Sequence, residues 1–272
     1  MSSRTEENSN NRVRRAALRF LAIDRWRALG DALKREADIC PVPVLSTPAM
    51  LGSAFIGLIP LPFIYLQTQV PSRTVDLSVV VIGVTTLVAI WLRWRMKLSY
   101  NRITTWREAF SVTHTAFALG CVPAVIVLLC CPDLFSQQQQ FVQQTLVAKA
   151  PPDMSAAMIW ARMIGSLALI GAWAAVTEEV IYRGLIVSVI RRWGYDMPQR
   201  RKDLIAAVVG GAIFGLAHLP TWGPIAGIAL FGLGFGFSLG FIANGEKLMP
   251  LIIYHFAFDM ISMLISIAGL FR

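Results

Sequence analysis

Long runs of apolar residues, separated by short polar segments, dominate the chain beyond its first 40 residues. Run length is the main signal, because about 20 apolar residues form an α-helix long enough to cross the hydrocarbon core of a bilayer. The apolar segments lie at 44–66, 77–96, 109–131, 155–190, 203–219, 224–244 and 248–270. This pattern predicts an all-α, polytopic integral membrane protein, a helical bundle of about seven transmembrane helices with a range of six to eight.

The 155–190 segment is longer than a single span needs, so we expect it to kink, to continue as an interfacial helix or to consist of two pieces. Composition agrees with a membrane location, since the chain is 56% hydrophobic and 15% charged. A soluble globular protein is more polar than this.

The polar start of the chain has a helical pattern of its own, in residues 10–37. Apolar residues recur there at helical spacing among arginines: Val13, Ala17, Phe20, Ile23, Trp26, Leu29 and Leu33. The spacing predicts an amphipathic helix on the cytoplasmic leaflet; the alternative is a solvated helix that packs on the protein. We divide the chain into a basic N-terminal cytoplasmic segment (1–40), N-terminal transmembrane helices (41–154) and a C-terminal membrane core (155–272).

The basic residues alternate between loops and predict the orientation. Residues 1–40 hold nine Lys and Arg, and 93–107 and 191–202 hold five each, whereas 67–76 has only Arg73 and 132–154 only Lys149. Cytoplasmic loops are rich in Lys and Arg. We therefore expect an integral protein of a bacterial inner (plasma) membrane, with a cytoplasmic N-terminus. The net charge of +9 is spread over separate loops, which disfavours nucleic acid as a partner.

Two adjacent carboxylates, Glu178 and Glu179, interrupt an otherwise apolar segment. An ionised side chain near a bilayer centre costs roughly 2.5 to 3.5 kcal/mol even on insertion scales, unless it is paired or hydrated. Arg183 follows Glu179 by four residues, the spacing of a helical ion pair. Glu178 has no such local partner and is therefore a candidate functional residue.

Two later segments carry the other polar groups. His218 ends the stretch Phe214-Gly-Leu-Ala-His218, and His255 precedes Asp259 by four residues. That spacing places the second pair on one helix face, where both side chains can reach one atom or one water. A carboxylate base, two imidazoles and a second carboxylate suit hydrolysis by an activated water, with or without a metal.

These motifs resemble those of a known family. Their order is Glu178-Glu179-x-x-x-Arg183, then Phe214-x-x-x-His218, then His255-x-x-x-Asp259, on three successive apolar blocks. They are similar to the motif set of the CPBP intramembrane proteases, the CAAX-protease and bacteriocin-processing family, also called the ABI family. The resemblance covers roughly residues 155–270. The family's glycine-rich helix between the second and third motifs corresponds to Gly232, Gly236 and Gly240, which predict close helix packing.

The resemblance implies an intramembrane endopeptidase that cuts membrane-associated peptides, either prenylated C-termini or leader-type sequences. Glu178 would be the general base, and Glu179 would hold Arg183. His218 and His255, with Asp259, would either stabilise the oxyanion or bind a divalent metal such as zinc. If a metal is bound, His218, His255 and Asp259 are its expected ligands. Both mechanisms stay open at this point.

Two other functions stay open as well. A non-catalytic immunity or scaffold protein could use the same fold to bind another membrane protein. A proton-coupled transporter could use the acids as a relay, although the chain shows no inverted repeat. Elsewhere, His114 is interpreted as an interhelical hydrogen-bonding residue. The four cysteines form no CxxC motif and predict no metal site.

Overall fold

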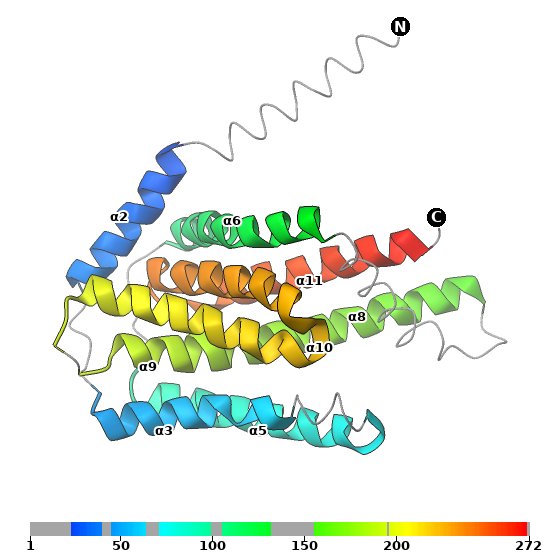
Figure 1. Ribbon diagram of the computed structural model, residues 1–272, viewed down its shortest axis with the longest axis horizontal. Helices are drawn as coiled ribbons and strands as arrows, with labels where there is room; N and C mark the ends of the chain where they lie inside the picture. Colours follow the sequence, from blue (N-terminus) through cyan, green and yellow to red (C-terminus); the bar gives the residue numbers. More distant parts are fainter. Residues whose placement is uncertain are drawn as a thin grey trace, which may run out of the picture.

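The structure is a computed structural model, and it describes residues 23–39, 45–63, 71–98, 105–131, 155–194 and 196–270. The helices are α2 (Ile23–Ile39), α3 (Thr47–Leu58), α5 (Pro71–Arg95), α6 (Trp106–Cys130), α8 (Ala156–Glu178), η2 (Glu179–Val187), α9 (Ser188–Arg191), α10 (Gln199–Ala243) and α11 (Leu248–Leu270). They lie side by side along the long axis, while α2 crosses one end of the bundle (Figure 1). Within the described ranges, the only β pairing is a bridge between Leu45 and Trp193.

The helices confirm the predicted all-α membrane bundle. Four of the described helical stretches are long and apolar enough to cross a membrane: Trp106–Cys130, Ile164–Arg191, Gln199–Ala243 and Leu248–Ile265. The first apolar segment, predicted at 44–66, gives the shorter helical stretch Thr47–Phe63, in which α3 ends at Leu58 and a turn at Ile59 precedes a further helical turn.

The long α10 is a hairpin of two helices. Its backbone leaves helical geometry at Gly223, where φ is 76°, a value that favours glycine. The two arms pack back on each other so tightly that a Cβ on Gly215 would lie 2.6 Å from the carbonyl oxygen of Gly227. The arms correspond to the predicted segments 203–219 and 224–244. Figure 1 shows them adjacent, in yellow and orange.

The predicted 155–190 segment is one continuous helical stretch that contains a π-helix near its C-terminal end. The stretch passes from α8 into the π-helix η2 and ends in α9. At the exit from η2, the Ser188 N–H donates to the carbonyl of Arg183, five residues back. Every residue of η2 is buried, and the segment contacts α3, α5, α10 and α11. Such π segments occur frequently at functional sites, and this one begins at the paired glutamates.

Glycines bring α6 and the second arm of α10 into backbone contact. A Cβ on Gly236 would lie 2.5 Å from the Ala116 carbonyl oxygen and 2.7 Å from Gly120 Cα. A Cβ on Gly232 would lie 2.9 Å from the Gly120 carbonyl oxygen. The predicted role of the glycine stripe in close packing is confirmed, and the neighbour is α6.

The apolar side of α2 packs on protein. Leu29 and Ala32 are buried in the core formed by α6 and α10. Arg35 donates to Glu108 of α6 at 2.5 Å. Ile23–Ile39 therefore packs on an apolar surface of α6 and α10, as the alternative expects, and its position on the leaflet stays a prediction. Residues 10–22 of that prediction lie outside the described residues.

Candidate active site

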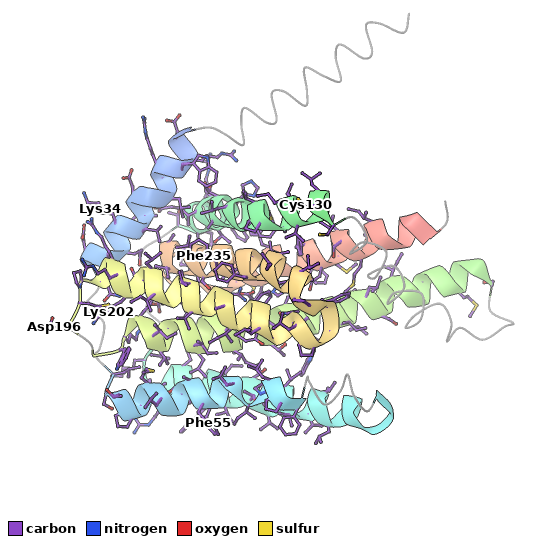
Figure 2. The ribbon with its side chains drawn as sticks, viewed as in Figure 1. Lys34, Phe55, Cys130, Asp196, Lys202 and Phe235 are labelled. Carbon is purple, nitrogen blue, oxygen red and sulfur yellow. The ribbon has the colours of Figure 1, made fainter. Side chains whose placement is uncertain are left out.

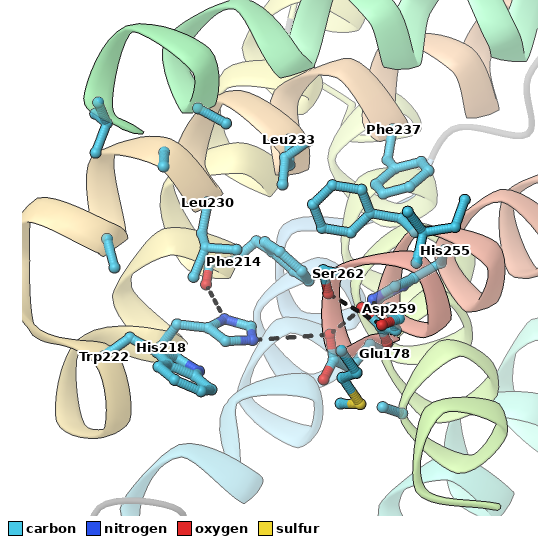
Figure 3. Close-up of a pocket in the computed structure, with 18 of the residues that line it drawn as sticks. Glu178, Phe214, His218, Trp222, Leu230, Leu233, Phe237, His255, Asp259 and Ser262 are labelled. Atoms are coloured by element: carbon cyan, nitrogen blue, oxygen red, sulfur yellow. Dashed lines mark hydrogen bonds and ion pairs between the residues drawn. The ribbon is translucent and has the colours of Figure 1, made fainter. Parts of the chain in front are cut away.

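Four of the predicted residues converge from three helices (Figure 3). Glu178 ends α8, His218 lies in the first arm of α10, and His255 and Asp259 share one face of α11. The Oε2 atom of Glu178 is 4.0 Å from His218 Nε2 and 3.7 Å from His255 Nε2. His255 Nε2 is 3.6 Å from Asp259 Oδ2, as the four-residue spacing predicts.

Glu178 is the least restrained of these acids. Its side chain is 24% exposed, and its Oε2 atom has no hydrogen-bond partner among the described residues. The gaps to the two imidazoles exceed the length of a hydrogen bond. Separations of this size suit a small group that bridges the carboxylate and both rings.

Hydrogen bonds fix the orientation of both imidazoles. The Nδ1 of His218 lies 2.7 Å from the carbonyl oxygen of Phe214, one turn earlier. A carbonyl oxygen only accepts, so Nδ1 carries the proton and Nε2 is directed toward Glu178. The Nδ1 of His255 lies 2.8 Å from Glu179 Oε1, which leaves its Nε2 facing Glu178 and Asp259.

Glu179 and Arg183 form the predicted ion pair, and both side chains are fully buried. Arg183 Nη1 donates to Glu179 Oε1 at 3.0 Å, and Nη2 donates to the carbonyl of Gly234 at 3.2 Å. The guanidinium also lies over the rings of Phe214 and Phe237, 4.5 and 5.3 Å from their centroids. The ion pair therefore ties η2 to both arms of α10.

A cavity of about 460 Å³ begins at the four convergent residues and extends between the helices. Its wall is otherwise mostly apolar, with Ala124, Val127 and Leu128 from α6, Trp222 to Leu233 from α10, and Phe258 to Ile265 from α11. A mostly apolar pocket with a few convergent polar groups is typical of a ligand or substrate site. Figure 3 shows Trp222 beside His218 and Ser262 beside Asp259 at this wall.

A second set of charged residues lies past the C-terminal end of η2, and we call it the arginine cluster: Arg93, Arg191, Arg192, Asp203 and Glu246. All five side chains are buried. Arg191 pairs with both Asp203 and Glu246, and Arg192 pairs with Glu246 at 2.6 Å. Arg93 donates to the carbonyls of Gly184 and Glu246 and to Ser188 Oγ, which anchors η2 to α5.

The electrostatics of the arginine cluster are visible at Glu246, which lies in the connection between α10 and α11. Burial by itself would raise the pKa of its carboxyl group, but Arg191 and Arg192, with Arg93, hold that pKa below its ordinary value of 4.5. In the sequence, Arg93, Arg191 and Arg192 counted only as basic loop residues. Their burial depends on their shared partner Glu246, which is 153 residues from Arg93 in the chain, so no local pattern could predict it.

The predicted metal ligands were compared with the geometry that a metal needs. Within the described part of the chain, no group of three or more His, Cys, Asp or Glu side chains is arranged to hold a metal ion. Zinc takes its ligands at about 2.0–2.2 Å for nitrogen and oxygen and needs three of them from the protein in a catalytic site. His218, His255 and Asp259 thus converge without forming a preassembled metal site.

The remaining predicted features have plain structural roles. His114 contacts the ring of Tyr254 from α11, with centroids 5.7 Å apart, so it lies at a helix interface, and its interhelical hydrogen bond stays a prediction. The sequence alone did not point to Phe237, to the bond between Glu179 and His255, or to the arginine cluster. These features depend on which helices become neighbours.

Comparison with known proteins agrees with the site. The model of a family described as Type II CAAX prenyl endopeptidase Rce1-like matches residues 160–261. Comparisons with curated proteins and with solved structures gave no significant match. The matched range contains the paired glutamates, Arg183, both histidines and Asp259. Over these residues the chain is similar to the Type II CAAX prenyl endopeptidase Rce1-like family, in agreement with the resemblance that its three motifs predicted.

Proposed function

We propose that the protein is an intramembrane endopeptidase in which Glu178 activates the attacking water. The observation that carries the proposal is the position of Glu178 Oε2, which faces the Nε2 atoms of His218 and His255 at 4.0 and 3.7 Å inside the cavity. A water held there lies within reach of a base on one side and of two imidazoles on the other.

In this mechanism the Glu178 carboxylate accepts a proton from the water while the oxygen attacks the scissile carbonyl carbon. General-base catalysis contributes roughly 10²- to 10⁴-fold. The proton then passes to the leaving amine nitrogen as the C–N bond breaks. Because Glu178 is not held by an arginine, it is free to take up the proton and release it again.

His218 and His255 would bind the oxyanion of the tetrahedral intermediate. For His255, the bond from Nδ1 to Glu179 presents Nε2 to the cavity, and Asp259 lies 3.6 Å from Nε2 on the other side. An imidazolium at this position would donate to the oxyanion while Glu179 balances its charge. A single oxyanion donor typically contributes about 2.7–4 kcal/mol.

Glu179 and Arg183 would act as positioning residues. Arg183 holds Glu179, and Glu179 orients His255. The position of the His255 ring in the site would therefore depend on how η2 is packed. The substrate would be a polypeptide at the membrane whose apolar side chains occupy the cavity wall. Prenylated and leader-type peptides both meet this requirement.

The test is Glu178→Gln, with Asp196→Asn as the matched control. Both variants exchange a carboxylate for an amide, but Asp196 is exposed, in the loop before α10. Quantitative proteomics of N- and C-terminal peptides would compare cells with each variant. We expect the terminal peptides that depend on the protein to disappear for Glu178→Gln and to remain for Asp196→Asn.

The two variants must be present at equal levels of folded protein, so that a loss of terminal peptides reports a loss of activity. Persistence of these terminal peptides with a stably expressed Glu178→Gln protein would refute the mechanism, whereas the absence of any terminal peptide that depends on the protein would favour the non-catalytic scaffold function.

A further inference from the structure

The imidazole of His255 presents Nε2 to the cavity only while the plane of its ring is held. The hydrogen bond between Nδ1 and Glu179 Oε1 holds one edge of the ring. The imidazole can still turn about its Cβ–Cγ bond, because the terminal torsion of a histidine has a broad energy minimum. A contact at the face of the ring is therefore needed to fix its plane.

Phe237, on the second arm of α10, supplies that contact. Its ring stacks on His255 with an interplanar angle of 27° and centroids 5.4 Å apart. Phe214 meets the same imidazole edge-on, at 6.0 Å and 69°. Stacked and edge-on pairs at such separations are favourable arrangements of aromatic rings. Figure 3 shows Phe237 beside His255. A turn of the imidazole would break the stacked contact, so Phe237 limits the plane of the His255 ring.

Phe237 is itself held from two further directions. Its side chain is 1% exposed, and the ring of Phe117 from α6 packs against it with centroids 5.2 Å apart. The guanidinium of Arg183 lies 5.3 Å from the Phe237 centroid. The same arginine donates to Glu179, so it holds both groups that contact His255, one by an ion pair and the other by a cation–π contact.

The close packing of α6 on α10 brings the two phenylalanines together. Phe117 follows Ala116 and Phe237 follows Gly236, the pair at which a Cβ would lie only 2.5 Å from the facing carbonyl oxygen. A wider gap between the helices would draw Phe117 away from Phe237. Because α6 lies outside residues 160–261, the support of the site extends beyond the range that matches the family model.

We propose that Phe237 is a positioning residue that fixes the plane of the His255 ring, with Phe117 as its support on α6. This inference rests on the proposed function, because the plane of the ring matters to turnover only if His255 binds the oxyanion. Phe237 also lines the cavity, so direct contact with substrate is the competing role. A positioning residue affects kcat, whereas a contact that only binds substrate affects KM.

The same arm of α10 offers matched controls. Phe241 lies one turn after Phe237, is fully buried, and has the Arg93 guanidinium of the arginine cluster 5.4 Å from its centroid. Methionine in place of either phenylalanine keeps an apolar side chain but removes the ring and its cation–π contact. Figure 2 shows Phe235, also on this arm, whose ring stacks on Phe231 with centroids 6.4 Å apart. Phe241→Met and Phe235→Met are therefore the controls for Phe237→Met.

The first measurement is turnover by purified protein in detergent. The substrate is a synthetic peptide that spans a cleavage site found by the comparison of terminal peptides. We expect Phe237→Met to lower kcat by roughly 10- to 100-fold with KM nearly unchanged, and Phe237→Tyr to keep most of the wild-type kcat because it keeps the ring. Phe241→Met and Phe235→Met should match wild type per folded molecule. A rise in KM alone, or equal losses in the three methionine variants, would overturn the proposal.

The second measurement reports the His255 ring without turnover. The chain has three histidines, so protein labelled with ¹³C,¹⁵N-histidine gives three sets of ring signals, which His114→Gln and His218→Gln assign. The face of the Phe237 ring shifts the carbon-bound protons of His255 by its ring current. We expect Phe237→Met to remove this shift and to broaden the His255 signals, and Phe241→Met to leave them as in wild type. Unchanged His255 signals in Phe237→Met would reject the positioning role.

The two measurements separate the positioning role from the proposed chemistry. Full turnover by Glu178→Gln would refute the chemistry, and the histidine spectra would still decide what holds the His255 ring. Loss of turnover in Glu178→Gln with unchanged His255 signals in Phe237→Met would keep the protease mechanism and reject the role of Phe237. If Phe237→Met folds poorly, Phe117→Met replaces it, and we expect a smaller change of the His255 signals in the same direction.

Discussion

Glu179 and His255 are joined by a hydrogen bond of 2.8 Å between Oε1 and Nδ1, although 76 residues separate them in the chain. The same Oε1 atom also accepts from Arg183. One carboxylate oxygen therefore connects the π-helix, the imidazole of α11 and a guanidinium that lies over two phenylalanine rings. The adjacent glutamates thus have different roles: Glu179 is held by hydrogen bonds with Arg183 and His255, whereas Glu178 faces the cavity.

The different roles of Glu178 and Glu179 predict different effects of their substitution on the stability of the protein. Glu179→Gln and Arg183→Leu each leave a buried charge without its partner, so each should destabilise the protein by about 3–5 kcal/mol. Glu178→Gln removes a carboxylate whose Oε2 is unbonded within the described structure and should leave stability close to wild type. Thermal unfolding in detergent and protein abundance would measure this. Equal losses in all three variants would contradict the division.

A second prediction concerns metal. The role proposed for Glu178 as a general base needs no metal, so this mechanism predicts that purified protein carries much less than one metal per chain and keeps its activity with a strong chelator. Elemental analysis and activity before and after chelation would test this. One zinc per chain, with activity lost to chelation and restored by zinc, would instead give His218, His255 and Asp259 ligand roles.

A third prediction concerns Glu246. Its pKa is depressed in the folded protein, so its contribution to stability is present above its ordinary pKa of 4.5 and is lost as the pH falls through the lower folded value. Glu246→Gln should therefore destabilise strongly near neutral pH, and its difference from wild type should shrink in acid. The free energy of unfolding of both proteins, measured at a series of pH values from 7 downward, would show this.

Glu108→Gln is the matched control for Glu246→Gln, because its partner Arg35 is 44% exposed and Glu108 itself 37%. An exposed pair of this kind contributes about 0–1 kcal/mol. A pH-independent effect of Glu246→Gln, or an effect no larger than that of Glu108→Gln, would argue against a structural role for the arginine cluster.

A fourth prediction uses two helical glycines. Gly236→Ala would place a Cβ 2.5 Å from the Ala116 carbonyl oxygen, so α6 and α10 must separate, and we expect a loss of about 1–3 kcal/mol. Gly165→Ala in α8 meets no atom within 4 Å and should be neutral or stabilising by up to about 1 kcal/mol. Melting temperatures of the two variants give the comparison, and similar values would contradict the close packing.

The sequence predicted much of this arrangement for reasons that are local. Run length predicted the membrane helices, and four-residue spacing predicted both the Glu179–Arg183 pair and the His255–Asp259 face. For the N-terminal helix, amphipathicity predicted only that an apolar face must be covered, and α6 and α10 cover part of that face. The π-helix and the partners of Arg93 depend on packing between distant segments, which no local pattern records.

The position of the arginine cluster bears on the bilayer itself. A protease that brings water into a membrane risks opening a leak for protons, especially with carboxylates and imidazoles along the way. Here the cavity ends at Glu179 and Arg183, and a layer of paired, fully buried charges stands between it and the basic end. The cavity is thus closed toward the basic end, so that water can reach a peptide bond in it without a continuous path for protons across the membrane.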